Sequence, residues 1–397
     1  MGSQNHTSIK TVSRTERGRQ LGLALGLGIL AVGATAPAQA ETREYMMNWF
    51  IEASNALPND TDCPQGLNGS PEEMVTAQLR AVGLSKEVTE NLVTNITGGT
   101  GGPAIQEAII YRGRDLEGRP MHAYAYPVSV PDVKAMKSNT GPYAYGFNLD
   151  GKIGPNDFID PDTNEKGIDN AYWRSSGCQV NQRGSRTEPP TYGSRHWDIA
   201  RDKQAAWLVR LEAADFSKDG DVTVHIFRAM ERAVRDATGV PRRYWTFRRD
   251  PDARWQNTFK GTIKNGVIFA EGERFEMLGD PYGVTNLKLR VPKFRGYFEK
   301  DGSLEAVLGG YLPWKVLYME GSNGGPNYEF MSGTNIPALY YSLKQAADAS
   351  PDPQTGQNTE ISTTWRINAI PAFIRESEQV TAPANVQFSN TSNSRSK

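Results

Sequence analysis

The sequence predicts a mainly β protein: an antiparallel β-sandwich or partly open barrel with a small helical N-terminal cap and one C-terminal helix. Segments of alternating polarity fill the second half of the chain, and a period of two is typical of half-buried strands. Asp-Gly and Asn-Gly pairs lie between these segments, and such pairs tolerate the positive φ of tight hairpin turns. Antiparallel strands with one apolar face must cover it with a second sheet or close on themselves, so sandwich and barrel remain alternatives.

Residues 1–40 have the composition of a secretory signal peptide. A basic start precedes an apolar run over 21–36, and a small-residue cleavage site ends at Ala40. The run is shorter than the roughly 20 residues that a membrane-spanning helix needs. We therefore expect a general (Sec-type) signal cleaved after Ala40, a bacterial periplasmic or secreted product, and no transmembrane segment afterwards. The basic residues are Lys10, Arg14, Arg17 and Arg19.

The charge balance of the exported chain does not predict binding to nucleic acid. Removal of residues 1–40 takes away four basic residues and one acidic residue, which leaves 40 lysines and arginines against 44 aspartates and glutamates. Proteins that bind nucleic acid usually carry a basic patch instead. The remaining 357 residues are ample for a large core.

Cys63 and Cys178 are the two cysteines of the chain. Disulfides form and persist in exported proteins, and an even cysteine count favours one bridge between the two. The alternative is two separate buried thiols, because free cysteine is among the most buried residue types.

Region 41–103 is predicted to be a helical cap with a linker. Ser70, Pro71 and Glu73 form a capping-box helix start, and Gly83 ends the apolar pattern that follows. Two further helices are expected, at Tyr45–Ala56 and Ser85–Asn95, with a glycine-rich connector at 98–103.

Region 104–200 is predicted to be a loop-rich β region, with strands at Ile105–Tyr111 and His122–Val130. Region 201–376 is predicted to be an antiparallel β-domain that contains one helix, Ile336–Ala349, and a last strand, Ile361–Ile374. Its hairpin turns are expected at Asp219-Gly220, Asn265-Gly266 and Asp301-Gly302. Residues 377–397 are polar and are predicted to be a disordered tail.

The densest polar cluster lies between Asn148 and Asn170, where six carboxylates and four carboxamides occur in 23 residues beside two lysines. Oxygen ligands on a turning backbone suit calcium, which takes roughly six to eight of them. We therefore predict calcium as a bound ion. The expected ligands are Asp150, Asn156, Asp157, Asp160, Asp162, Asn164 and Asp169.

This region does not have the ligand spacing of an EF-hand, and a solvated acidic loop whose Asp and Asn residues make turns is the alternative. The stretch from Asp352 to Gly356 repeats the pattern of Asp160 to Asn164, and both stretches are predicted to be turns. Asp348, Asp352 and Asn358 form a second candidate ion site.

Aromatic side chains surround the acidic region. Flat amphipathic rings stack on sugars or anchor protein partners, although packing in a core is the alternative. The predicted ligand-binding aromatics are Tyr143, Tyr145, Tyr172 and Trp173.

The sequence has no clear catalytic signature. His196 lies between Ser194 and Asp198, but no nucleophile-elbow motif accompanies them. Glu212 and Glu329 are the acidic residues whose neighbours indicate a partly buried setting. Two catalytic carboxylates leave no fixed spacing in the sequence, so a carboxylate pair stays an alternative. The hairpins, the acidic region and the surface-type aromatics, without a nucleophile or metal motif, favour a binding protein.

The leading hypothesis is an exported non-catalytic binding or structural protein that is stabilised by calcium and contacts a polysaccharide or an envelope protein. The alternative is a secreted polysaccharide hydrolase that uses a carboxylate pair. A third possibility is a subunit of a larger surface assembly.

Overall fold

The computed structural model describes residues 40–97, 102–134, 136–185, 188–191, 204–278 and 286–377. These residues belong to one compact unit, Gln39–Lys397. The predicted signal peptide up to residue 39, most of the glycine-rich connector, the segment around His196 and the predicted tail from residue 378 lie outside the described residues.

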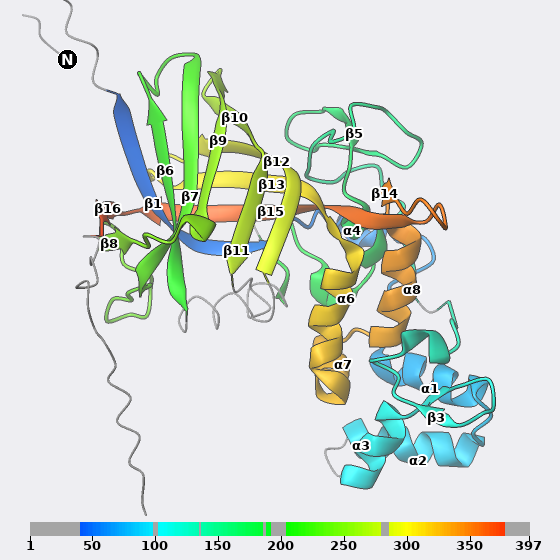
Figure 1. Cartoon of the computed structure of the whole chain (residues 1–397). Coiled ribbons are helices and arrows are strands. Elements are labelled where there is room, and N and C mark those ends of the chain that lie inside the picture. Colours follow the sequence, from blue (N-terminus) through cyan, green and yellow to red (C-terminus); the bar gives the residue numbers. More distant parts are fainter. Residues whose placement is uncertain are drawn as a thin grey trace, which may run out of the picture. The chain divides into compact units, whose positions relative to one another are not determined.

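Eight antiparallel strands close into a barrel (Figure 1), in the order β7-β6-β1-β15-β13-β12-β10-β9, with β9 pairing back to β7. The mainly β prediction is confirmed, but the sheet is neither a sandwich nor an open barrel. Closure leaves none of these eight strands with a free edge. The strands are β1 (Glu41–Glu52), β6 (Ala205–Ala213), β7 (Gly220–Arg232), β9 (Gln256–Lys264), β10 (Val267–Gly272), β12 (Asn286–Phe298), β13 (Leu304–Pro313) and β15 (Asn358–Pro371).

Shorter strands are attached to the barrel or lie outside it. Strand β11 (Arg274–Leu278) pairs with β12, β14 (Ala349–Pro351) pairs with β15, and β8 (Thr246–Arg249) pairs with β7. Strand β16 (Phe373–Glu376) runs parallel to β8. Two separate hairpins are formed by β2 (Gly113–Arg114) with β3 (Pro120–Met121) and by β4 (Phe158–Ile159) with β5 (Lys166–Ile168).

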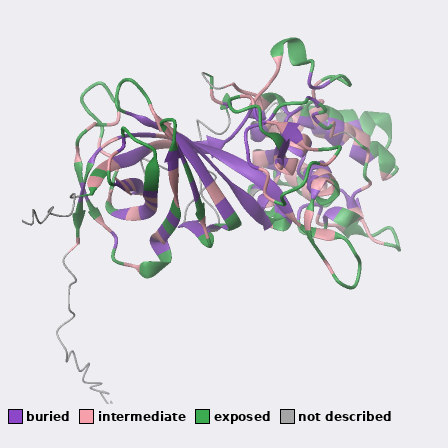
Figure 2. Cartoon of the chain, turned by 90° about the horizontal axis from the view of Figure 1, so that it is seen from above, coloured by how far each residue is buried: buried purple, intermediate pink, exposed green. Residues whose placement is uncertain are grey.

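Alternate side chains of the barrel strands form one apolar core. On β6, Trp207, Val209 and Leu211 belong to it, as the alternating pattern predicts. The same core continues into the helices that follow β13, through Leu317 and Leu343. Figure 2 shows the strands largely buried and the surrounding loops exposed.

Only one of the three predicted hairpin turns is a two-residue turn. Asn265 and Gly266 have φ of 51° and 78° and connect Lys264 directly to Val267. Asp301-Gly302 lies in a wider loop, and Asp219 ends the loop before β7, which begins at Gly220, although both hairpins form. Around Asp301 the side chain accepts a hydrogen bond from the Ser303 N–H, which builds a broader turn between Phe298 and Leu304.

The predicted helix at Tyr45–Ala56 is wrong, because this segment is strand β1. It pairs with β6 on one side and with β15 on the other. A register shift between Met47 and Trp49 interrupts the alternation, and it places apolar residues at a spacing that resembles a helix. Two flanking strands outweigh such a local pattern, since they satisfy the backbone hydrogen bonds on both sides.

Seven α-helices are described, rather than a small cap and one C-terminal helix. The capping box at Ser70 and the helix after Ser85 are confirmed, whereas the predicted strand at Ile105–Tyr111 is helix α3 and most of His122–Val130 is turn. The α-helices are α1 (Pro71–Ala81), α2 (Lys86–Thr97), α3 (Pro103–Ile110), α4 (Ala171–Ser176), α6 (Trp314–Asn323), α7 (Gly325–Ser332) and α8 (Ile336–Ala346). Short 3₁₀ turns lie at Pro58–Asp60, Pro127–Ser129, Val180–Gln182 and Ala253–Trp255.

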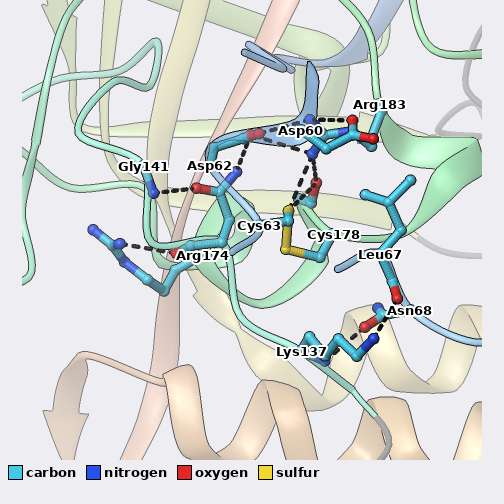
Figure 3. The surroundings of a disulfide bond; sticks show 12 residues. Asp60, Asp62, Cys63, Leu67, Asn68, Lys137, Gly141, Arg174, Cys178 and Arg183 are labelled. Atoms are coloured by element: carbon cyan, nitrogen blue, oxygen red, sulfur yellow. Dashed lines mark hydrogen bonds and ion pairs between the residues drawn. A yellow bond between two sulfur atoms is a disulfide. The ribbon is translucent and has the colours of Figure 1, made fainter. Parts of the chain in front are cut away.

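The predicted disulfide between Cys63 and Cys178 is confirmed, with Cα atoms 5.8 Å apart. Arg183 lies beside it and pairs with Asp62 at 2.7 Å and Asp60 at 3.1 Å (Figure 3). The bridge ties the loop before α1 to the end of α4. Within the described part of the chain, no helix is both long and apolar enough to cross a membrane.

Candidate acidic pocket

A pocket of about 530 Å³ lies where the acidic region, helix α4, the C-terminal end of α8 and strands β13 and β15 meet. Four carboxylates line it, and the two predicted ion sites both contribute to them. The lining residues that carry charge or a polar group are Ser138, Asp150, Asn156, Asp157, Asp169, Asn170, Arg174, Tyr311, Ser342, Gln345, Asp348 and Asn358.

Local turns position Asp169 and Asn170 at the start of α4. One Asp169 oxygen accepts hydrogen bonds from the backbone N–H groups of Leu149 (2.7 Å) and Asp150 (3.2 Å). Asn170 caps α4, since its side-chain oxygen accepts from the Trp173 N–H at 3.1 Å. The acidic loop is therefore folded back onto the beginning of this helix.

Asp348 comes to the pocket from the other end of the chain. It follows α8, and its carboxylate accepts hydrogen bonds from the Ser362 N–H (2.8 Å) and hydroxyl (2.5 Å) on β15. Asn358 donates to the Ala347 carbonyl at 2.9 Å and so fixes the same corner. These contacts join the end of α8 to the barrel wall.

The carboxylates of the pocket repel one another when ionised, and this repulsion favours their protonated forms. Burial, together with nearby Asp150 and Asp348, raises the pKa of Asp169 to about 6. Asp348 is exposed by surface area, yet the surrounding protein limits hydration of its carboxylate, and this raises its pKa with a further contribution from Asp150. Burial and these same three carboxylates raise the pKa of Tyr311. The pocket is thus an acidic environment that favours protons or cations.

Few basic groups offset this charge. Arg174 lines the pocket, but its guanidinium donates to the carbonyls of Asn139 (2.9 Å) and Asn156 (2.5 Å) and lies 3.9 Å from the centre of the Phe158 ring. Lys152 approaches Asp150 at 3.5 Å from solvent. An exposed pair of this kind neutralises little charge.

The remaining members of the predicted ion site lie in a separate turn. One Asp160 oxygen accepts from the N–H groups of Asp162 and Thr163, and the other pairs with buried Arg295. Asp162 and Asn164 are exposed on this turn. The structure therefore places Asp150, Asn156, Asp157 and Asp169 at the pocket and Asp160, Asp162 and Asn164 outside its lining.

The predicted likeness of the two Asp-Pro turns is confirmed by their hydrogen bonds. Asp352 accepts from the N–H groups two and three residues ahead and from the Thr355 hydroxyl, as Asp160 does with Thr163. Asn164 and Gly356, at equivalent positions, have φ of 58° and 69°. Both are turns, and Asp352 does not line the pocket.

No three His, Cys, Asp or Glu side chains among the described residues are grouped so that they could hold a metal ion together. A cation in the pocket would need carboxamide, carbonyl or water oxygens in addition to the carboxylates, or a small movement of the loops. Calcium accepts such mixed oxygen ligands.

The four predicted ligand-binding aromatics have different surroundings. Tyr145 and Trp173 are buried in small apolar clusters, with Phe147 and Phe158 respectively, and Tyr172 packs partly buried against the main core. Tyr143 is 39 % exposed. The ring that lines the pocket is instead Tyr311, which sequence reasoning did not single out.

The carboxylates considered for catalysis lie apart from the pocket lining. Glu329 is fully buried, pairs with Arg112 at 2.8 Å and accepts from the Tyr124 hydroxyl at 2.7 Å. Glu212 faces His225 at 3.6 Å on the barrel surface. A buried, fully paired Glu329 is suited to holding α7 against the segment after α3, because a paired buried charge is costly to disturb.

Comparison of this chain with protein-family models, with curated proteins and with solved structures found no match. The arrangement of the pocket is therefore the basis for any statement about function.

Proposed function

We propose that this chain is an exported binding protein, in which the closed barrel is a rigid scaffold and the acidic pocket receives the ligand. The observation that carries the proposal is the convergence of Asp150, Asp169 and Asp348 beside Tyr311, with raised pKa values at Asp169 and Asp348. Perturbed carboxylates in a concave site are typical of functional sites. The volume lies within the roughly 300–1,000 Å³ of small-molecule pockets.

The chemistry of the lining favours a hydroxyl-rich ligand bound together with a cation. Carboxylates accept hydrogen bonds from hydroxyl groups, and the carboxamides of Asn156, Gln345 and Asn358 both donate and accept. A calcium ion would relieve the repulsion among the acids, and exported proteins meet enough calcium to fill weak sites. A segment of an envelope polysaccharide fits this description, and an envelope protein that offers a basic or hydroxyl side chain is the related partner.

Titration calorimetry tests the proposal. Protein stripped with a chelator is titrated with calcium and then with a panel of glycans, alongside Asp169→Asn and Asp348→Asn. Asp352→Asn is the matched control, because Asp352 is an aspartate near the same corner that does not line the pocket. Loss of binding in the first two variants and not in the control is the expected result. Absence of heat with every glycan, with and without several millimolar calcium, would contradict the proposal.

A polysaccharide hydrolase remains the second candidate, because one specific observation favours it. A carboxyl whose pKa is raised to about 6, as for Asp169, can donate a proton near neutral pH, and Asp348 is a neighbouring carboxylate in the same pocket. Release of reducing sugar that disappears in Asp169→Asn would establish this alternative. Saturable binding without release supports the binding protein.

A further inference from the structure

A second surface lies on the small parallel pair β8–β16, away from the pocket lining. We propose that this surface binds to lipid bilayers that carry anionic headgroups. It will be called the β8–β16 face, and it consists of Met230, Arg232, Arg242, Tyr244, Arg248, Phe373 and Arg375.

The strand register separates the two sides of this small sheet. Ala229 lies opposite Arg249, and Ile374 lies beside Phe247. Ala229, Phe247 and Ile374 are buried together against the outer wall of the barrel. Because side chains alternate along a strand, Met230, Arg248, Phe373 and Arg375 point to the opposite, outward side.

The outward side of this small sheet exposes large apolar side chains, whereas a face that is simply solvated usually carries polar ones. Tyr244 and Phe373 are 60 % and 53 % exposed, and their ring centres lie 6.1 Å apart. Met230 is 50 % exposed on the neighbouring strand. Two large rings exposed side by side, with a third apolar side chain on the same side of the small sheet, are typical of an interaction surface.

The backbone at Tyr244 holds its ring in this position against a conformational preference. Its φ is 57°, in the left-handed region that bulky residues rarely adopt. The Tyr244 N–H donates to the Pro371 carbonyl at 2.6 Å, which ties the turn to the start of β16. Strain that the surrounding structure maintains is more common at functional positions than elsewhere.

The charges around these rings are basic. Arg232, Arg242 and Arg375 are exposed, and they make no ion pair with any described residue. Two nearby acids pair with other arginines: Glu231 with Arg248, and Glu376 with Arg210 and Arg249. Asp236, on the loop between β7 and β8, accepts hydrogen bonds from Thr238 and Val240 and offsets one of the three positive charges. The face therefore carries unneutralised positive charge.

Exposed aromatic rings beside arginines that lack a carboxylate partner complement an anionic bilayer surface, although the Arg242 guanidinium also lies 4.8 Å from the centre of the Trp245 ring. Tyrosine and phenylalanine enter the headgroup region, while arginines remain near the phosphates. A soluble polyanion would be bound by the arginines and would not require the rings. This distinction separates the two sources of negative charge in an experiment.

Vesicle co-sedimentation tests the inference, with the chain from Glu41 to Lys397 so that the apolar run at 21–36 does not contribute. Vesicles of 30 % phosphatidylglycerol in phosphatidylcholine are compared with vesicles of phosphatidylcholine alone. The variants are Tyr244→Ser/Phe373→Ser and Arg242→Gln/Arg375→Gln. Leu116→Ser is the apolar control because Leu116 is fully exposed on the β2–β3 turn. Lys86→Gln/Lys166→Gln is the charge-matched control.

Wild-type protein is expected to bind the anionic vesicles, and the arginine variant is expected to bind roughly 25-fold more weakly, about 5-fold for each charge near an anionic surface. The ring variant should lose binding as well, and both controls should bind like wild type. Circular dichroism melting confirms that each variant is folded. Absence of wild-type binding, equal losses in the controls, or losses in the arginine variant alone would overturn the inference. Asp348→Asn should bind vesicles like wild type, which keeps this result separate from the proposed pocket function.

Discussion

Replacement of Asp160 by asparagine is expected to destabilise the protein strongly, whereas the same replacement at Asp352 is not. The two aspartates occupy equivalent positions in equivalent turns, and their side chains accept the same backbone hydrogen bonds. They differ in burial, in an ion pair, and in a further hydrogen bond that Asp160 accepts from the Gly146 N–H at 3.3 Å. Asp160 is completely buried and pairs with Arg295, whose side chain is 6 % exposed, whereas Asp352 lies in an exposed turn.

The magnitude follows from that difference. Asp160→Asn keeps an oxygen that accepts from the turn but leaves the Arg295 charge buried without a counter-charge, which costs about 3–5 kcal/mol. For a domain of this size, such a loss lowers the melting temperature by roughly 4–7 °C. Asp352→Asn keeps the turn and exposes no buried charge, so its melting temperature should remain close to that of wild type.

Differential scanning calorimetry of the two single variants measures the effect, and a double-mutant cycle identifies its cause. Arg295→Met removes the unpaired charge, so Asp160→Asn/Arg295→Met should be more stable than the sum of the single changes predicts. Equal melting temperatures for Asp160→Asn and Asp352→Asn would refute the reasoning, because the turn and not the ion pair would then carry the stability.

Three further predictions concern the pocket, the helices and the disulfide. The folded-state pKa of Asp169 is raised to about 6, so its protonated form stabilises the fold; this stabilisation is fully present below about pH 3.8 and is lost as the pH rises through 6. In urea unfolding between pH 4 and 7, the free energy of unfolding of wild type should therefore fall with rising pH, and Asp169→Asn should not show this fall. Glu329→Gln leaves Arg112 unpaired in the helical region and should cost about 3–5 kcal/mol in the same assay, and an unchanged midpoint would contradict the assigned role. Cys63→Ser/Cys178→Ser opens a loop with a sequence separation of 115 residues and should cost about 4–5 kcal/mol in the chain-entropy model; reductant should destabilise wild type and not this variant.

Short-range signals predicted the elements that depend on neighbouring residues. The capping box at Ser70, the Asn265-Gly266 turn, the helix that begins at Ile336 and the alternation along β6 each form as expected. In each case the hydrogen bonds or the buried face involve residues close in sequence. The even cysteine count predicted the disulfide because only one pairing exists.

Long-range contacts decided the elements that were predicted wrongly. The segment at Glu41–Glu52 is a strand because β6 and β15 pair with it from both sides, and an apolar stretch of this length does not distinguish helix from strand by itself. Closure of the barrel likewise depends on the pairing of β7 with β9, which the alternation of either strand does not reveal.

The amino-acid sequence by itself determined that the chain is rich in antiparallel hairpins, that residues 148–170 form acidic turns, and that two cysteines are available for one bridge. Only the tertiary structure decided which of those acids share a pocket. Asp169 meets Tyr311 and Asp348 because α4, β13 and the end of α8 pack at one corner of the barrel. Turn formation needs a few adjacent residues, whereas the burial that raises the pKa of Asp169, and the repulsion from distant Asp348 that adds to it, depend on how segments far apart in the sequence pack together.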